Sequence, residues 1–334
     1  MKALPYRPPT SMKLVTFQLG EEIRVGVAKA DWVVDVGRTV ELVANRKAGL
    51  GSHPVLRKPA QTVLAAGPEP RDMNEFLARG EEWRAALDQV LDALATALPP
   101  AEAPRGLLTP LKAARLRAPL LRPGKIVCVG RNYAEHARER GAETPAQPIF
   151  FLKSANTICG PGDPIILPPN SNQVDYEAEL AVVIGKGGRG IPEDRAAEHI
   201  AGYTILNDVS ARDMQSLDKQ WFRGKSCDTF APCGPWIVTR KEIPDPHALA
   251  ISLTLNSETM QDANTGDMIF KIPFLVSYLS QSLTWEPGDI LSTGTPAGIG
   301  GSRTPPVFLK PGDTVSITVE QVGTLTNPVR RPQE

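Results

Sequence analysis

The stretch Val174-Asp175-Tyr176-Glu177-Ala178-Glu179-Leu180-Ala181-Val182-Val183-Ile184-Gly185 places two acidic side chains within an apolar run. From Tyr176 the run is rich in β-branched and apolar residues and stops at a glycine, which predicts a β-strand. Side chains alternate between the two faces of a strand, so Glu177 and Glu179 project from the same face. Two buried carboxylates on one face repel each other unless a positive charge lies between them. A divalent cation with oxygen ligands meets that need. An edge strand with two solvated glutamates is an equally open interpretation of this stretch alone.

Composition and charge exclude several classes of protein. The chain has 334 residues, of which 41% are hydrophobic and 22% charged, as in an ordinary globular protein. Lys+Arg and Asp+Glu each number 37, so no net positive charge indicates a nucleic-acid or membrane-surface partner. No apolar run is long enough to span a membrane, and the first residues lack the apolar segment of a secretory signal. The four cysteines match neither a zinc spacing nor a disulfide framework, so we expect free thiols in a cytoplasmic protein. They are Cys128, Cys159, Cys227 and Cys233.

The pattern of the chain changes near residue 120. We expect a disordered extension at 1–11, a smaller accessory domain at 12–121 and a larger domain at 122–330. The accessory domain opens with short alternating runs and continues with a helical pattern over 73–98, which Pro99 stops. Beyond that boundary, short strands are separated by Gly/Pro turns and joined by a few short helices. We expect strands at 125–129, 149–152, 176–184, 201–206, 236–239, 251–255, 290–292 and 314–319, and helices at 133–140, 194–199, 210–217 and 272–282. The larger domain is therefore expected to be α+β, strand-dominated, with a rolled or folded sheet.

His136 and Glu139 are three residues apart on one expected helix, in the run Gly130-Arg131-Asn132-Tyr133-Ala134-Glu135-His136-Ala137-Arg138-Glu139. This spacing places both side chains on one face. A carboxylate beside an imidazole orients the ring and raises its basicity, which is how a general base is tuned near neutral pH. A surface ion pair on an exposed helix has the same spacing, and the pair alone does not decide between these interpretations.

Three further runs carry polar side chains at the ends of expected strands. Asp208 lies where an apolar strand gives way to a helix, and Arg212 and Gln215 are three residues apart on that helix. Lys225 lies between a glycine and a serine, as in an anion-binding loop, although an exposed loop lysine has the same surroundings. The run from Ser292 to Gly300 is a strand followed by a glycine-rich turn, which exposes backbone N–H groups and the hydroxyl of Thr295.

Together these runs resemble the fumarylacetoacetate hydrolase family, in its acylpyruvase-like branch, which includes fumarylpyruvate and acylpyruvate hydrolases and 2-hydroxyhepta-2,4-diene-1,7-dioate isomerases. The resemblance extends over about 200 residues, from Lys125 to Val319. It implies a rolled mixed β-sheet for the catalytic domain at 122–330, with a smaller N-terminal α/β accessory domain. The matching pieces are 127–133 with His136 and Glu139, 151–153, 176–180, 207–215, 224–226, 268–270 and 288–296.

The resemblance also implies roles for individual residues. Glu177, Glu179 and Asp208 correspond to ligands of a divalent metal, usually Mg²⁺, with Mn²⁺ or Ca²⁺ also accepted. His136 corresponds to a general base oriented by Glu139, and Gln215 and Lys225 to groups that hold water and the developing anion. The substrate contacts implied are Arg131, Tyr133, Lys153, Arg212 and Thr295.

These parts lead us to expect a metal-dependent hydrolase that cleaves a C–C bond in a 2,4-dioxo acid. The expected substrate is an acylpyruvate or a diketo sugar acid, and the expected role is in aromatic or sugar acid catabolism. Pyruvate or a related 2-oxo acid would be released. The alternative is an isomerase, a tautomerase or an oxaloacetate-type decarboxylase, because the same parts stabilise an enolate without a water attack. A non-catalytic metal-dependent binding module needs no base beside the metal, so His136 argues against it. We expect a small 2-oxo acid as substrate and a homodimer through the C-terminal domain.

Overall fold

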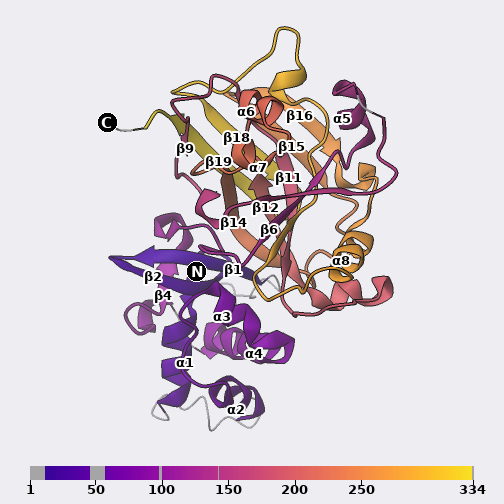
Figure 1. Cartoon of the computed structure of the whole chain (residues 1–334). Helices are drawn as coiled ribbons and strands as arrows, with labels where there is room; N and C mark the ends of the chain where they lie inside the picture. Colours follow the sequence, from indigo (N-terminus) through magenta and orange to yellow (C-terminus); the bar gives the residue numbers. More distant parts are fainter. Residues whose placement is uncertain (1–11, 46–56, 98–99, 142, 333–334) are drawn as a thin grey trace. The chain divides into compact units, whose positions relative to one another are not determined.

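The computed structural model describes residues 12–45, 57–97, 100–141 and 143–332. The extension expected at 1–11 therefore lies outside the described residues. The chain divides into two compact units, Met1–Leu116 and Arg117–Glu334, which Figure 1 colours from indigo to yellow along the sequence. Across the described ranges, none of the helices combines the length and the apolar character that a membrane crossing needs.

Within residues 12–45, 57–97 and 100–116, the first unit contains an antiparallel sheet in the order β4–β3–β2–β1, with β5 paired to β1, and four α-helices. The helical pattern over 73–98 forms two helices rather than one. The first ends at Ala78, and Gly80 adopts φ +83°, a conformation that glycine tolerates and that interrupts a helix. The elements are β1 (Lys13–Leu19), β2 (Glu22–Lys29), β3 (Trp32–Asp35), α1 (Val36–Ala44), α2 (Arg57–Ala65), α3 (Met73–Ala78), α4 (Gly80–Ala97), β4 (Leu108–Pro110) and β5 (Arg115–Leu116).

The second unit contains a mixed sheet in the order β14–β12–β11–β17–β6–β7, with β8 paired to β14. Its central strand, β11, is buried along its whole length, as its continuous apolar run predicts. The strands are β6 (Ile126–Gly130), β7 (Ile149–Lys153), β8 (Ile158–Cys159), β11 (Ala178–Ile184), β12 (Ile200–Asn207), β14 (Ala231–Thr239) and β17 (Ile290–Ser292).

A second sheet in this unit has the order β16–β15–β18–β19–β9, and β10 pairs with β13 in a short ladder. These strands are β9 (Ile165–Ile166), β10 (Val174–Asp175), β13 (Ser210–Ala211), β15 (Ala250–Leu255), β16 (Glu258–Asn264), β18 (Thr314–Val319) and β19 (Gly323–Arg330). The helices are α5 (Ala134–Glu139), α6 (Arg212–Leu217), α7 (Phe222–Lys225) and α8 (Ile272–Ser280), with a 3₁₀-helix, η6, at Glu193–His199. The expected α+β, strand-dominated fold is confirmed.

The register of the first of these sheets brings several chain segments together at one end. β11 runs antiparallel to β12 and to β17, and β6 runs parallel to β17. The start of β11 therefore lies beside the ends of β12, β17 and β6. The residues that follow those three ends are Asp208, the glycine-rich turn after Ser292, and Arg131. This end of the sheet is where polar side chains from distant parts of the sequence meet.

Candidate active site

Three buried carboxylates form the centre of this site. The carboxylates of Glu177, Glu179 and Asp208 each offer an oxygen, and these oxygens lie within 4.8 Å of one another. Glu179 is the second residue of β11, and Glu177 precedes that strand in an extended segment. Backbone contacts tie this segment to the end of β12, since Glu177 N–H donates to Asn207 Oδ1 at 3.0 Å and Asp208 N–H donates to Glu177 O at 2.9 Å.

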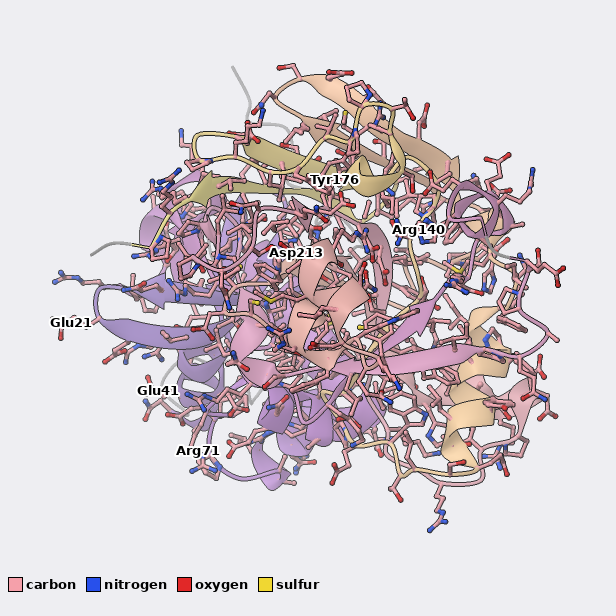
Figure 2. All side chains as sticks on the ribbon, turned by 45° about the horizontal axis from the view of Figure 1, so that its top comes forward. Glu21, Glu41, Arg71, Arg140, Tyr176 and Asp213 are labelled. Atoms are coloured by element: carbon pink, nitrogen blue, oxygen red, sulfur yellow. The ribbon has the colours of Figure 1, made fainter. Side chains whose placement is uncertain are left out.

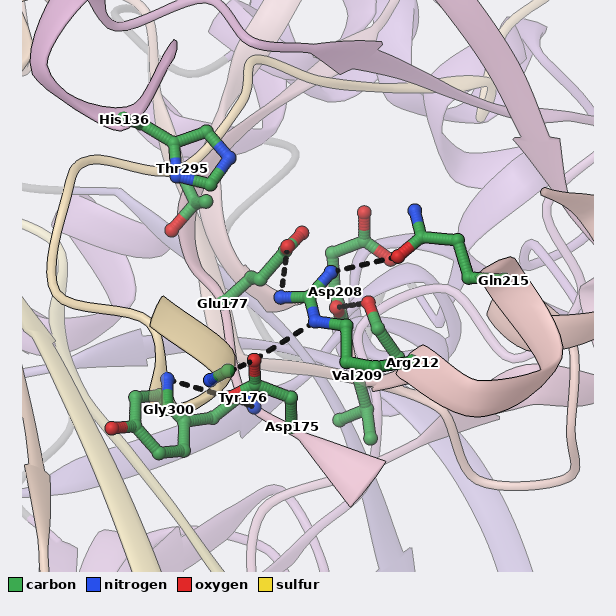
Figure 3. Close-up of polar contacts among 12 residues, drawn as sticks. His136, Asp175, Tyr176, Glu177, Asp208, Val209, Arg212, Gln215, Thr295 and Gly300 are labelled. Atoms are coloured by element: carbon green, nitrogen blue, oxygen red, sulfur yellow. Dashed lines mark hydrogen bonds and ion pairs between the residues drawn. The ribbon is translucent and has the colours of Figure 1, made fainter. Parts of the chain in front are cut away.

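Two of the carboxylates are paired with buried cations. Lys225 Nζ donates to one oxygen of Glu177 and one of Asp208, each at 2.7 Å. Lys153 Nζ donates to the other Asp208 oxygen at 2.7 Å, and Arg212 Nη2 donates to the other Glu177 oxygen at 2.6 Å (Figure 3). Burial alone would raise the pKa of Glu177, but Lys225 and Arg212 outweigh it and hold that pKa well below its usual range. Glu177 is therefore a carboxylate at neutral pH.

Glu179 has a different environment. Its Oε2 accepts hydrogen bonds from Ser292 Oγ at 2.5 Å and from Gly294 N–H at 2.9 Å. Within the described ranges no cation forms an ion pair with it. Burial, and then the neighbouring carboxylates of Asp208 and Glu177, raise the pKa of Glu179 well above its ordinary value. Its negative charge is thus costly at this position unless a further cation is present.

The donor set fits a divalent metal ion. Asp175, which accepts from Arg212 Nε at 2.8 Å, joins the three carboxylates. Among the described residues, Lys153, Lys225 and Arg212 form ion pairs with three of these four acids, and Glu179 is the acid left without one. Clustered carboxylate oxygens are the ligands that Mg²⁺, Mn²⁺ and Ca²⁺ prefer. A bound divalent ion would place positive charge beside Glu179 and so offset both its burial and its repulsion from Asp208 and Glu177. The cluster can therefore hold a metal ion.

His136, which is buried, and Glu139, which is partly buried, form a pair on α5. His136 Nδ1 lies 2.7 Å from Glu139 Oε1, and the His136 residue is 7% exposed. Glu139 Oε2 accepts from Gly298 N–H at 2.9 Å, which ties α5 to the glycine-rich turn. The pair is consequently not a solvated surface ion pair. Because an ionised carboxylate only accepts hydrogen bonds, Nδ1 carries the proton and Nε2 is left as the basic nitrogen.

A cavity of about 200 Å³ brings most of the expected site residues together. Eight of them line it: Arg131, His136, Glu177, Glu179, Arg212, Gln215, Lys225 and Thr295. Three others do not line the cavity but lie next to its lining. Glu139 contacts His136, Asp208 contacts Lys225, and Lys153 contacts Asp208. Tyr133 lies apart from the cavity lining, in the hydrophobic core with 2% exposure, so its role as a substrate contact stays a prediction.

The structure adds residues that the sequence did not single out. Asp175 fixes Arg212 and also accepts from the backbone N–H groups of Gly300 and Gly301 at 2.8 and 2.9 Å (Figure 3). Its position two residues before Glu177 was the available signal, because alternation places both on one face. Asn132 donates to Thr293 O at 2.7 Å and so holds the glycine-rich turn beside the end of β6. Arg140, one residue beyond α5, lines the cavity.

The chain belongs to the fumarylacetoacetate hydrolase family, because the family's C-terminal sequence profile matches residues 125–330. It is 50% identical over 262 residues to a mitochondrial oxaloacetate tautomerase of Bos taurus, a match that covers 78% of this chain and 80% of that protein. It is 42% identical over 328 residues to a mitochondrial oxaloacetate tautomerase of Rattus norvegicus, covering 97% of this chain and 94% of that protein.

Solved structures agree with this assignment. A fumarylacetoacetate hydrolase from Exiguobacterium antarcticum matches with a TM-score of 0.76 and 33% identity, over 96% of this chain and 100% of that one. A 2-hydroxyhepta-2,4-diene-1,7-dioate isomerase from Mycobacterium marinum matches with a TM-score of 0.68 and 33% identity, over 97% of this chain and 100% of that one. The family resemblance seen in the sequence is confirmed.

The expected reaction, hydrolysis of a C–C bond in a 2,4-dioxo acid, is wrong, and so is the expected enzyme class, a hydrolase acting on such bonds. The similar curated proteins are oxaloacetate tautomerases, which favours the isomerase or tautomerase alternative. The error has a chemical reason. An acidic cluster, a histidine base and a lysine stabilise negative charge on an enolate oxygen whether a C–H or a C–C bond breaks. The residue types therefore do not distinguish the two reactions.

Proposed function

We propose that this protein is a metal-dependent tautomerase that interconverts the keto and enol forms of a 2-oxo acid of the oxaloacetate class. The observation that carries the proposal is the partly buried His136–Glu139 pair, placed in one cavity with an acidic cluster that can hold a metal ion. The oxaloacetate tautomerases among the similar proteins support the choice of reaction.

We assign Glu177, Glu179 and Asp208 as the ligands and Mg²⁺ as the metal. When bound, the ion supplies a fixed positive charge that makes the proton next to a carbonyl group more acidic. Lys153, Lys225 and Arg212 limit the rotation of Glu177 and Asp208 through the hydrogen bonds described above, and Lys225 and Arg212 hold the pKa of Glu177 below its usual range.

His136 is the proposed base. Tautomerisation of the keto form breaks a C–H bond on the carbon beside the 2-oxo group and forms an O–H bond on the 2-oxo oxygen. A base must therefore take the carbon proton, and the enolate oxygen must receive a proton from the protonated base or from water; the reverse reaction returns a proton to the carbon. Nε2 of His136 is the free nitrogen of a ring whose Nδ1–H is held by Glu139, and the histidine lines the cavity. Glu139 stabilises the imidazolium that forms while His136 holds the proton.

Lys225, Gln215 and Arg212 are the proposed partners of the substrate's oxygen atoms. Arg212 Nη1 donates to the amide oxygen of Gln215 at 3.0 Å, so the amide N–H groups of Gln215 remain as donors in the cavity (Figure 3). The Lys225 ammonium is 2% exposed and lies 4.8 Å from the centre of the Phe151 ring, which fixes its position. Its positive charge stabilises negative charge on an enolate oxygen.

The proposal is tested by following the ultraviolet absorbance of enol-oxaloacetate after it is added to the purified protein. We expect the approach to the keto–enol equilibrium to be faster with protein and Mg²⁺ than with Mg²⁺ alone, and the protein's contribution to disappear with EDTA. Pyruvate, assayed in the same samples, should not exceed the amount formed without protein. Pyruvate release that matches the loss of oxaloacetate would instead identify a decarboxylase.

The two oxaloacetate tautomerases named above are mitochondrial, whereas a cytoplasmic location for this chain stays a prediction. A small-molecule substrate is consistent with the family, and the homodimer expected from the sequence is retained as a proposal with its own test below.

A further inference from the structure

We infer that Arg140, together with Arg131, binds the distal carboxylate of the substrate and so makes this tautomerase selective for 2-oxo dicarboxylates. The inference rests on the proposed function. That function places the 2-oxo acid end of the substrate at the acidic cluster and its C–H group at His136, and the inference adds the group that binds the other end of the substrate.

The basic residues of the cavity fall into two groups. Arg212 and Lys225 are held by Asp175, Glu177 and Asp208. Arg131 and Arg140 also line the cavity, but neither makes a hydrogen bond or an ion pair through its side chain within the part of the chain that the structure describes. Arg131 is partly buried and Arg140 is exposed at the cavity, so both guanidinium groups are free to bind an anion that enters it.

Arg140 lies on the same side of its helix as the proposed base. It follows α5 directly, and its backbone N–H donates to His136 O at 3.3 Å, within the last helical turn. Residues four apart share a helix face, and both His136 and Arg140 line the cavity (Arg140 is labelled in Figure 2, beside the purple α5). Partial burial, followed by the Arg212 cation, lowers the pKa of Arg140, although the carboxylates of Glu177 and Asp175 act in the opposite direction.

Arg131 is fixed by its backbone. It adopts φ +57°, a left-handed conformation that is strained for a residue with a side chain. The side chain of the next residue, Asn132, holds this turn. Its Nδ2 donates to Thr293 O at 2.7 Å and to Phe270 O at 3.1 Å, and its Oδ1 accepts from Phe270 N–H at 2.8 Å. The position of Arg131 at the end of β6 is thus determined by the surrounding structure.

The order of groups in a 2-oxo dicarboxylate matches this arrangement. Its 2-oxo acid end belongs at the acidic cluster, its acidic C–H group at His136, and its second carboxylate one carbon beyond. A planar guanidinium binds a carboxylate through two parallel hydrogen bonds, which an apolar tail cannot form. A monocarboxylic 2-oxo acid would leave Arg140 and Arg131 without a partner and would bind more weakly.

The test compares Arg140→Gln and Arg140→Lys with a control, Arg138→Gln, on the same helix. Arg138 is exposed and does not line the cavity. With Mg²⁺ and oxaloacetate, we expect Arg140→Gln to lower kcat/KM about 10- to 100-fold, mainly through KM, the range for a lost hydrogen bond to a charged group. Arg140→Lys should recover part of this loss, and Arg138→Gln should stay within twofold of the parent.

The same proteins are then given 2-oxobutanoate, which lacks the second carboxylate, and deuterium exchange at its C3 is measured. Arg140→Gln should leave this exchange within twofold of the parent. An equal loss for both substrates, or no loss for oxaloacetate, would overturn the inference.

A binding measurement separates this inference from the proposed reaction. Calorimetry in the presence of Mg²⁺ compares oxaloacetate with oxalate, which resembles the 2-oxo acid end alone. Selective weakening of oxaloacetate binding by Arg140→Gln supports the inference even if the parent shows no tautomerase activity, in which case only the proposed reaction fails. Unchanged oxaloacetate affinity in Arg140→Gln overturns the inference even if the parent is an active tautomerase.

Discussion

The imidazole of His136 and the carboxylate of Glu139 form a partly buried hydrogen bond, with Nδ1 2.7 Å from Oε1. Glu139 is in turn held by the backbone N–H of Gly298. The pair therefore joins α5 to the glycine-rich turn that follows β17. In the same turn, Gly294 N–H donates a hydrogen bond to Glu179 Oε2. The orientation of the pair depends on several strands at once, which is the property that a positioned base requires.

His136→Ala is expected to lower the rate of oxaloacetate tautomerisation by roughly two to four orders of magnitude, the usual contribution of a general base. The ultraviolet enol assay measures this rate. Mg²⁺ affinity should stay close to that of the parent, because His136 is not among the proposed ligands. A variant that tautomerises at the parent rate would exclude His136 as the base.

Glu139→Gln is expected to give a smaller defect than His136→Ala. The amide keeps most of the shape of the side chain but removes the negative charge that stabilises the imidazolium. The ultraviolet enol assay measures the tautomerisation rate, and Mg²⁺ affinity should stay close to that of the parent because Glu139 is not among the proposed ligands. A rate in Glu139→Gln equal to that of the parent would show that Glu139 does not support the base.

Glu179→Gln should abolish Mg²⁺ binding in calorimetry while leaving the metal-free protein at least as stable as the parent. The reason is that Glu179 is a buried acid whose raised pKa reflects burial and repulsion from Asp208 and Glu177, so neutralising it removes a cost. In the parent, Mg²⁺ at about 100 times its Kd should stabilise the fold by about 2.7 kcal/mol. Glu135→Gln, an exposed carboxylate on α5, is the matched control.

A cost to metal-free stability in Glu179→Gln would mean that another group already balances this charge. Undiminished Mg²⁺ affinity in Glu179→Gln would remove Glu179 from the proposed ligand set.

The thiols should differ sharply in reactivity. Burial raises the pKa of the Cys233 thiol to about 12 and raises that of Cys128 well above its ordinary value, so little thiolate forms at pH 8. Burial raises the pKa of the Cys227 thiol as well, but this is the only one of the four thiols that is partly exposed, so the reagent can reach it. With a chromogenic disulfide reagent at pH 8, the native protein should release about one equivalent quickly, and Cys227→Ser should remove that phase. Fast reaction of all four thiols without denaturant would contradict the structure.

The proposed homodimer is tested by light scattering, which should give twice the 36.1 kDa mass of the chain at micromolar concentration. An apolar strip is available in the second unit for such contact. Phe150 stacks on Tyr278, which is 40% exposed, and Leu152 on the same strand is 51% exposed. Leu152→Asp should shift the mass toward that of a single chain. A parent that already scatters as a single chain would refute the proposal.

The sequence predicts the central part of the site for a simple reason. Strand alternation places Glu177 and Glu179 on one face, and both line the same cavity in the structure. The positions after expected strands likewise indicate Asp208 and the glycine-rich turn. Contacts such as that between Asp175 and Arg212 could not be predicted, because they depend on how β10 and β13 pair, and no local pattern encodes this pairing.

In the fold, too, local patterns predict some elements and pairing between distant strands decides others. Apolar runs predict β17 and β18 with the observed bounds. β16 was not expected because its residues are mostly polar, and β19 was not expected because Asn327 and Pro328 are turn-forming residues. Pro328 is tolerated near the end of the strand, opposite Thr314, the first residue of β18. Pairing with neighbours, rather than intrinsic preference, forms these two strands.

The most direct test of the central claim is mass spectrometry of oxaloacetate incubated briefly in D₂O with the protein and Mg²⁺. Proton transfer by His136 without cleavage of the carbon chain predicts deuterium at C3 of an intact four-carbon acid. The incorporation should be faster than with Mg²⁺ alone and should return to that background in His136→Ala. Deuterated pyruvate formed at the rate of incorporation, or incorporation no faster than with Mg²⁺ alone, would contradict the assignment of this protein as a tautomerase.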